Sequence, residues 1–346
     1  MAARMAQGDR GRFSALRSAT APLVAVAVAI AVAPACSGNH HILSPEGKQA
    51  KSIALIAWFM FISAGAVTLL VFAALLHGMF RRHRTTRRGE PRRFVVGEQT
   101  WIIAGGVALP LVFIGILTAM SLHGLPSEAK PDAVAITVVG HQYWWEVQYP
   151  GLGVTTAEEI HVPVGRDVDV TLLSDDVIHS FWVPDLAGKI DMIPGQTNHL
   201  TLHADKAGTY RGQCAEFCGL QHANMIFFVV ADEPSTFDAW VRSESGAAPA
   251  PAPGTPAADG AIAFQELPCA SCHTIKGTAA NGTAGPDLTH FANRSTIGAG
   301  TVPNTPGYLG GWIADAQSTK PGSLMPPIPM RPDQLNALLA YLGTLK

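Results

Sequence analysis

Two long apolar runs stand out in the pattern of hydrophobic and polar positions. Residues 53–76 and 100–122 contain no charged side chain, and each run exceeds the ~20 residues that a helix needs to cross a bilayer. The segment between them carries seven arginines, which the positive-inside rule places in the cytoplasm. We therefore expect a transmembrane hairpin within residues 36–130, with both of its ends outside the cytoplasm. The alternative is a pair of buried helices in a soluble core.

A different pattern follows in residues 131–232. Apolar Val168, Val170 and Leu172 alternate with polar residues, and turn signals divide this region into short runs. Such alternation predicts a small antiparallel sandwich or barrel. Residues 225–231 form a continuous apolar run, which is typical of a buried closing strand.

The remaining segments indicate a secreted, multidomain chain. Residues 1–35 place arginines before an uncharged run that ends in small residues, the pattern of a cleaved signal peptide. Because Cys36 follows directly, the segment resembles a bacterial lipoprotein signal with Cys36 as the lipidated residue; an ordinary secretory signal is the alternative. Residues 233–258 include repeated Ala-Pro, which predicts a semi-rigid linker. A further domain then occupies residues 259–346.

Composition restricts the classes of function that the chain could have. The formal net charge of -2 argues against a nucleic-acid partner, which would require a basic excess. Hydrophobic residues make up 48% of the chain and charged residues 14%, as expected of a chain with membrane segments. The five cysteines lie at positions 36, 214, 218, 269 and 272. Each has a candidate chemical role, which leaves none for a disulfide.

Residues 213–225 contain a candidate metal-binding loop. Cys214, Cys218, His222 and Met225 are soft and borderline ligands of the kind that select copper. A disulfide would leave the histidine and methionine without a role, and zinc rarely recruits methionine. A mononuclear blue-copper site needs only one thiolate, so the second thiolate indicates two bridged coppers. The second copper needs another imidazole, and His179 lies at the end of an upstream apolar strand.

These residues resemble the dinuclear CuA centre of cytochrome c oxidase subunit II. The resemblance implies a cupredoxin-like barrel in residues 131–232. The residues that it assigns to copper are His179, Cys214, Glu216 through its backbone carbonyl, Cys218, His222 and Met225. It also implies that the Glu216 side chain reaches a magnesium ion held between subunits I and II.

The same resemblance gives roles to two further regions. The stretch from Gly140 to Glu146 is similar to the aromatic segment through which electrons enter CuA, with Tyr143 and Trp144 as the candidate rings. Family members usually have tryptophan at the position of Tyr143. Simple core packing is the alternative role for these rings. Glu98 resembles the glutamate at the mouth of a proton channel into subunit I, and it would also suit a helix N-terminus.

The C-terminal domain contains the motif of a c-type haem attachment site. In Cys269-Ala270-Ser271-Cys272-His273 the thiols bond to the haem and His273 is the proximal ligand. A thioredoxin-like redox pair is the competitor, but it requires a βαβ setting that this region lacks. The domain resembles a helical class I cytochrome c, which implies Met325 as sixth ligand, with Met330 as the fallback. By the same resemblance the Pro286 carbonyl orients His273.

Together the motifs identify a family: subunit II of a haem-c-bearing, caa3-type cytochrome c oxidase. The resemblance implies an aerobic respiratory, proton-translocating complex in the bacterial inner membrane. Electrons pass from cytochrome c through haem c and CuA to haem a and the oxygen-reducing site of subunit I. Its partners are subunits I and III, cytochrome c and membrane lipids, and both metal domains lie on the periplasmic or extracellular side.

Four other classes of protein are alternatives. A nitrous-oxide reductase with a similar CuA domain would require a long propeller domain, which is absent. A copper-delivery protein needs neither Met225 nor a haem, and it usually has a single anchor helix. A nitric-oxide reductase with a similar CuA domain stays open, because its catalytic centre lies on a separate chain. Quinol oxidase subunit II lacks the copper ligands, which excludes it.

Overall fold

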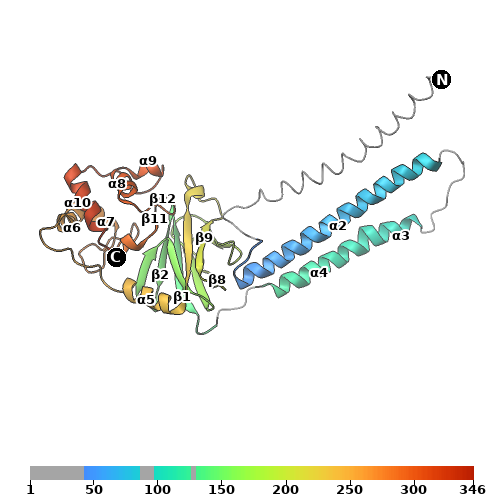
Figure 1. Cartoon of the computed structure of the whole chain (residues 1–346), viewed down its shortest axis with the longest axis horizontal. Helices are drawn as coiled ribbons and strands as arrows, with labels where there is room; N and C mark the ends of the chain where they lie inside the picture. The colour runs from blue at the N-terminus through green and yellow to red at the C-terminus, as the bar shows by residue number, and fades with distance from the viewer. Residues whose placement is uncertain (1–42, 86–96, 126–129) are drawn as a thin grey trace, which may run out of the picture. The chain divides into compact units, whose positions relative to one another are not determined.

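The computed structural model describes residues 43–85, 97–125 and 130–346, all of which belong to the compact unit Ile42–Lys346. The predicted signal peptide and Cys36 lie outside these residues. The described chain comprises two apolar helical segments, a β-sandwich and a helical C-terminal domain (Figure 1).

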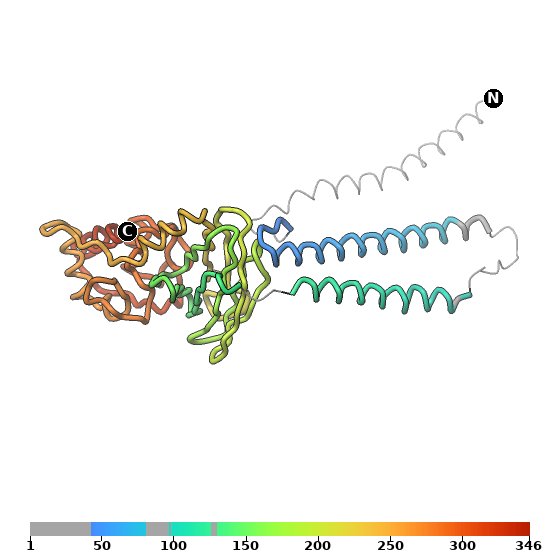
Figure 2. Tube along the Cα trace, turned by 90° about the horizontal axis from the view of Figure 1, so that it is seen from below, coloured from blue at the N-terminus to red at the C-terminus, as the bar shows by residue number. Residues whose placement is uncertain are grey.

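Both predicted membrane segments are helical, and both are longer than the apolar runs. The first is α2, Lys48–Thr85. The second consists of α3 (Glu98–Ile103), the π-helical turn η2 (Ala104–Ala108) and α4 (Leu109–His123). The two segments run side by side (Figure 2). The rings of Phe59 and Phe113 stack between them, with centroids 5.2 Å apart.

Most of the large apolar side chains on these helices are exposed, and both helices are long and apolar enough to cross a membrane. Buried helices of a soluble core would instead be covered by protein. Apolar helices that satisfy their own backbone hydrogen bonds and lack protein cover are typical of membrane spans.

The middle of the chain forms two five-stranded sheets. One sheet has the order β3-β2-β1-β5-β8, and the other has the order β4-β10-β9-β6-β7. The strands of the first sheet are β1 Val134–His141, β2 Trp144–Tyr149, β3 Val154–Ala157, β5 Asp167–Ser174 and β8 Asn198–His203. Those of the second are β4 Glu159–Pro163, β6 His179–Trp182, β7 Ile190–Met192, β9 Gly208–Cys214 and β10 Ile226–Asp232.

The predicted alternation is confirmed, but the expectation of a purely antiparallel sandwich is wrong. Val168, Val170 and Leu172 point into the core of the sandwich, each at most 1% exposed. Two strand pairs are parallel, β1 with β5 and β4 with β10. Alternation determines which face of a strand is buried, and it carries no information about the direction of the neighbouring strand.

An aromatic cluster fills the sandwich. Phe227 packs against Phe181 and Trp145 with ring centroids 4.5 and 5.0 Å away, and all three rings are fully buried. Cys214, Cys218 and Met225 belong to the same apolar core. The candidate metal loop is therefore seated on a close-packed support, which limits its movement.

Part of the segment predicted as a linker is helical. Helix α5 (Pro234–Glu244) places Phe237, Trp240 and Val241 against the core of the sandwich. These residues follow the i, i+3, i+4 spacing of an amphipathic helix. The Ala-Pro repeats that follow them led to the prediction of a linker instead. The irregular connection begins only after this helix.

The C-terminal domain has an apolar core of its own. Its main helices, α6 (Pro256–Glu266) and α10 (Pro332–Leu342), cross closely at Gly260, where a Cβ atom would lie 2.0 Å from the Ala337 carbonyl oxygen. The shorter elements are α7 Cys269–Cys272, η4 Phe291–Asn293, β11 Thr296–Ile297, β12 Val302–Pro303, α8 Pro306–Ala314 and α9 Ala316–Thr319.

Candidate metal centres

The loop between β9 and β10 is closed at its base by hydrogen bonds. Cys214, the last residue of β9, donates its N–H to the Met225 carbonyl over 3.0 Å. The next residue, Ala215, donates to the Ser180 carbonyl of β6, also over 3.0 Å. Because β6 carries His179, these bonds fix the loop relative to the distant histidine. The loop thus joins the last two strands of the sandwich.

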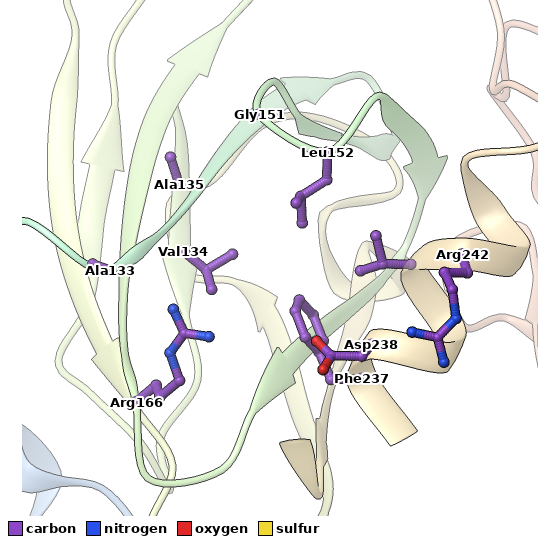
Figure 3. Close-up of a pocket in the computed structure, with 10 residues that line it drawn as sticks. Ala133, Val134, Ala135, Gly151, Leu152, Arg166, Phe237, Asp238 and Arg242 are labelled. Atoms are coloured by element: carbon purple, nitrogen blue, oxygen red, sulfur yellow. The ribbon is translucent and has the colours of Figure 1, made fainter. Parts of the chain in front are cut away.

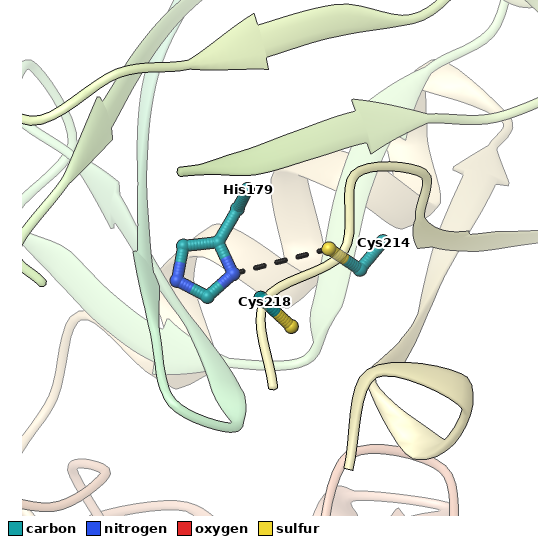
Figure 4. A group of neighbouring side chains, drawn as sticks. All are labelled: His179, Cys214 and Cys218. Carbon is teal, nitrogen blue, oxygen red and sulfur yellow. Dashed lines mark hydrogen bonds between the residues drawn. The ribbon is translucent and has the colours of Figure 1, made fainter. Parts of the chain in front are cut away.

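His179, Cys214 and Cys218 converge at one buried point (Figure 4). Their possible ligand atoms all lie within 4.8 Å of one another, and Nδ1 of His179 is 3.9 Å from Sγ of Cys214. All three residues are buried. This is a compact set of one imidazole and two thiols.

The other predicted copper ligands surround the same sulfurs. Sγ of Cys218 lies 3.7 Å from Nδ1 of His222 and 3.8 Å from Sδ of Met225. The Glu216 carbonyl oxygen lies 3.2 Å from Sγ of Cys214. The fold thus brings all six predicted residues together. Both cysteines are free thiols, so the disulfide alternative is not formed.

Asp176 orients the upstream histidine, a role that the sequence analysis did not assign. Its Oδ1 lies 2.8 Å from Nε2 of His179, and its other oxygen accepts the Gln142 N–H over 2.6 Å. The hydrogen bond directs Nδ1 of His179 towards the thiols, as carboxylates do for metal-binding histidines. Gly140 lets the His179 ring lie close to β1, since a Cβ atom at position 140 would be 2.9 Å from the ring. In the sequence, the only sign of this role is that Asp176 lies three residues before a predicted ligand histidine.

Each of the two thiols shifts the pKa of the other. A hydrogen bond with Cys218 lowers the pKa of Cys214 to about 3, with burial opposing this shift and His179 supporting it. The same hydrogen bond, together with burial, raises the pKa of Cys218 above its ordinary value. A metal held by these sulfurs would bind them as thiolates, because the thiolate is the ligand form.

The donor set fits copper. Two thiolates, two imidazoles and a thioether are soft and borderline ligands, whereas magnesium and calcium sites are built from oxygen ligands. A zinc site would use four ligands and rarely a thioether. Two sulfurs within reach of two separate imidazoles also provide one terminal nitrogen for each of two bridged metal ions.

The two aromatic candidates make different contacts, and Tyr143 is hydrogen-bonded to the metal loop. Its hydroxyl accepts the Leu220 N–H over 3.0 Å. Trp144 instead stacks on His141, with ring centroids 4.4 Å apart. Gln142, which the sequence analysis did not single out, donates its side-chain amide to the Cys218 carbonyl over 2.5 Å.

Two predicted acidic residues occupy different settings. The Glu216 carboxylate is 44% exposed and lies 3.6 Å from Nζ of Lys189, so it faces outward while its carbonyl faces the thiols. Glu98 is the first residue of α3, in agreement with a helix N-terminus; its side chain lies outside the described atoms.

The haem-attachment motif folds as a single helical turn. Both Cys269 and Cys272 are partly exposed free thiols, and the His273 N–H closes the turn on the Cys269 carbonyl over 3.0 Å. Nδ1 of His273 lies 2.8 Å from the Pro286 carbonyl oxygen, as expected. Because a carbonyl only accepts, Nδ1 carries the proton and Nε2 is left to bind iron. Burial lowers the pKa of His273, which favours this neutral ligand form.

Met325 and Met330 both lie between α9 and α10. Gln317, a residue that the sequence analysis missed, shapes this segment by donating its amide to the carbonyls of Ser323 and Met325 over 2.6 and 3.0 Å. Both methionines are partly exposed, and Met330 also packs against the apolar core of the domain. The position of Met325 on a hydrogen-bonded loop suits a ligand to a haem.

A groove of about 470 Å³ lies away from these centres. It is formed by the start of β1, the turn after β2 and helix α5, and Figure 3 shows Arg166 and Asp238 at its sides. None of its lining residues is a cysteine or histidine. The chemistry of the molecule therefore lies in the two ligand sets rather than in this groove.

Comparison with known proteins agrees with the geometry. The profile of the family "Cytochrome C oxidase subunit II, periplasmic domain" matches residues 153–232, and that of "Cytochrome c" matches residues 257–346. Cytochrome c oxidase subunit 2 of Alkalihalophilus pseudofirmus is 37% identical over 326 residues, which cover 90% of this chain and 93% of the relative.

Two further proteins are similar over shorter stretches. Cytochrome c oxidase subunit 2 of Bacillus sp. PS3 is 32% identical over 77% of this chain and 80% of the relative. The crystal structure of the periplasmic domain of subunit II of cytochrome oxidase (CoxB) of Bradyrhizobium japonicum is 31% identical. The matched region covers 35% of this chain and 96% of the CoxB chain, with a TM-score of 0.33.

Proposed function

Since the chain belongs to the cytochrome c oxidase subunit II family, we propose that its two ligand sets hold a CuA copper pair and a haem c. The chain is the subunit II of a caa3-type haem–copper oxidase, and it transfers electrons from cytochrome c. When bound, CuA and haem c each carry one electron at a time. The oxygen-reducing centre is assigned to subunit I.

The copper pair is proposed to bind at the loop after β9. His179 and His222 would each supply a ring nitrogen, Cys214 and Cys218 would supply two thiolate sulfurs, and Met225 would supply the thioether. The Glu216 carbonyl completes the set. The convergence of His179, Cys214 and Cys218 in the buried core is the observation that carries this assignment.

The protein residues contribute position and protection from water. The backbone bonds at the loop base and the Asp176 carboxylate hold the ligands in place before a metal arrives. A site that is already organised undergoes little rearrangement when its charge changes, which favours rapid electron transfer. Burial of both thiols excludes solvent from the sulfurs.

Haem c is proposed to attach through thioether bonds to Cys269 and Cys272, and His273 and Met325 would supply ligands to its iron. The hydrogen bond between His273 and the Pro286 carbonyl supports the role of His273. The Gln317 contacts that shape the Met325 loop support the role of Met325. Met330 is the alternative sixth ligand.

A magnesium ion is proposed at the Glu216 side chain, in the interface with subunit I. Two features support it: the carboxylate faces outward, and the carbonyl of the same residue faces the copper ligands. One residue would thus connect the two sites. Glu98 is proposed at the mouth of a proton channel into subunit I, consistent with its place at the start of α3.

The chain is a two-pass membrane protein with periplasmic domains. We place it in the bacterial inner membrane, with subunits I and III and membrane lipids around α2 and α4. The exposed apolar side chains of both helices support contacts with lipids and neighbouring subunits. Cleavage before Cys36 and lipidation of that residue stay predictions from the sequence.

Two substitutions in the assembled oxidase test the assignment. Cys214→Ser should abolish the CuA absorption and oxidation of reduced cytochrome c, and it should leave the covalent haem in place. Cys272→Ala should weaken covalent haem attachment and leave the CuA absorption unchanged. If Cys214→Ser kept the CuA absorption, the assignment of the copper ligands would be wrong.

A further inference from the structure

The haem domain contacts the copper loop directly. The Ile226 N–H, one residue after Met225, donates to the Ala299 carbonyl over 3.1 Å. The Gln221 side chain, one residue before His222, donates to the Pro321 carbonyl over 2.7 Å. The segment around residue 321 leads to Met325. Hydrogen bonds to backbone carbonyls of the haem domain therefore join the segments that carry ligands of both proposed centres.

Lys320 lies at the middle of this contact. Its side-chain ammonium donates to the carbonyl oxygens of Tyr143, Asn224 and Gly298 over 2.9, 2.8 and 2.7 Å. An ammonium has three donors, and here all three are used. Lys320 is only 2% exposed, although lysine is rarely buried so completely.

The three acceptors come from three parts of the chain. Tyr143 belongs to the aromatic turn between β1 and β2, and Asn224 directly precedes Met225 in the copper loop. Gly298 belongs to the haem domain. A lysine that served only the fold of its own domain would not place two of its three hydrogen bonds on the other domain.

The surroundings compensate the buried charge. Glu158 of the sandwich is 5% exposed, and the charges of Lys320 and Arg294 both act on its carboxylate. Nearby, the Ser295 N–H donates to Glu159 over 2.7 Å. Burial of unpaired charges is strongly unfavourable. Such an arrangement suits a contact that stays closed better than one that opens repeatedly.

We propose that Lys320 is a positioning residue that locks the haem domain onto the copper-ligand loop in one fixed arrangement. The proposal rests on the ligand assignments given above. It goes beyond them because it states that electrons pass between the two centres across an interface that stays closed. A domain that was only tethered would instead have to find its docking site before each transfer.

The test uses the full chain in the assembled oxidase, with a protease site inserted after Ala252 in the exposed connection. Lys320→Met keeps the length of the side chain and removes its donors and charge. Lys320→Arg keeps both charge and donors. Lys346→Met alters an exposed lysine of the same domain and serves as the matched control.

The first readout is retention of the haem domain after cleavage, measured by size-exclusion chromatography. It needs no copper, so it is independent of the proposed function. Wild type and Lys346→Met should retain the domain, Lys320→Met should release it, and Lys320→Arg should restore at least part of the retention. Full retention in Lys320→Met would overturn the proposal.

The second readout is the rate of electron transfer from haem c to copper in uncleaved chains, started by photoinjection of one electron into the haem. Lys320→Met should slow this rate about tenfold or more, because the tether alone supplies only an effective concentration in the mM range. The absorption spectra and potentials of both centres should not change. An unchanged rate would refute a positioning role. Loss of the haem spectrum in Lys320→Met would show that Lys320 serves the fold of its own domain, and it would refute the proposal too.

If wild-type protein lacked a copper pair, the copper assignment would fail by itself. The retention experiment would still decide whether Lys320 holds the two domains together.

Discussion

The sulfur atoms of Cys218 and Met225 lie 3.8 Å apart in the core of the sandwich. Seven positions separate the two residues in the chain, and the closed loop base brings them together. The contact places a thioether beside one bridging thiolate. A thioether at this position is suited to tune the copper potential.

Met225→Leu tests that role. Leucine preserves the apolar packing to within about 1.5 kcal/mol of stability but removes the sulfur donor. Because a donor stabilises the more oxidised metal, its loss should raise the reduction potential of CuA while two coppers stay bound. Potentiometric titration of the CuA absorption measures the change. Met192→Leu, at another fully buried methionine, is the control, and equal potentials in both variants would contradict the assigned role.

The sixth haem ligand is tested by paired substitutions. Met325→Leu should convert the haem from sulfur-ligated, low-spin iron to a state that binds added imidazole readily. Met330→Leu should change mainly the stability of the domain, because that side chain packs in its apolar core. Absorption and magnetic circular dichroism spectra distinguish the two results. If only Met330→Leu removed the sulfur signature, the ligand assignments would be exchanged.

Glu158 predicts a pH dependence of stability. Burial raises its pKa from 4.5 to about 7, with the charges of Lys320 and Arg294 opposing the shift. Because the pKa is higher in the folded chain, the stabilising contribution is complete below pH 4.5 and is lost as the pH rises through 7. For one group the slope is at most about 1.4 kcal/mol per pH unit.

Thermal unfolding between pH 5 and pH 8, followed by haem absorbance, measures this effect. The decrease in melting temperature from pH 5 to pH 8 should be smaller in Glu158→Gln than in wild type. Glu266→Gln, at an exposed glutamate of the haem domain, controls for the change in net charge. Parallel curves for wild type and Glu158→Gln would exclude a contribution from this carboxyl.

The topology is tested by fusions at two positions. A reporter after Arg88 should be active only in its cytoplasmic form, because seven arginines lie between the two helices. A reporter after Pro131 should be active only in its exported form. The reverse pattern would place the copper loop in the cytoplasm, away from the side proposed for cytochrome c.

Most of the predicted copper ligands could be recognised as a set in the sequence because they are close together in the chain. Cys214, Cys218, His222 and Met225 lie on one loop, and their spacing is visible without any knowledge of the fold. His179 was found through its resemblance to the upstream histidine of the family, although it begins β6 and does not end the preceding strand as the sequence analysis expected. The interactions that support these ligands were harder to foresee. Asp176 acts through one hydrogen bond, and many aspartates precede histidines without such a role.

The contacts between domains could not be predicted from local patterns. Lys320 has no sequence signature, since its acceptors are backbone carbonyls that any residue could provide. The parallel pairing of β1 with β5 also depends on how distant segments meet. Helix α5, in contrast, carried a recognisable amphipathic spacing that the neighbouring Ala-Pro repeats obscured.

The central claim is that two thiolates on one loop bridge two copper ions. It is tested most directly by metal analysis and electron paramagnetic resonance of the purified full-length protein. Two coppers and one iron per chain are expected, with one unpaired electron shared equally by the two copper nuclei in the oxidised form. One copper per chain with a mononuclear blue-copper spectrum, or zinc in its place, would contradict the account.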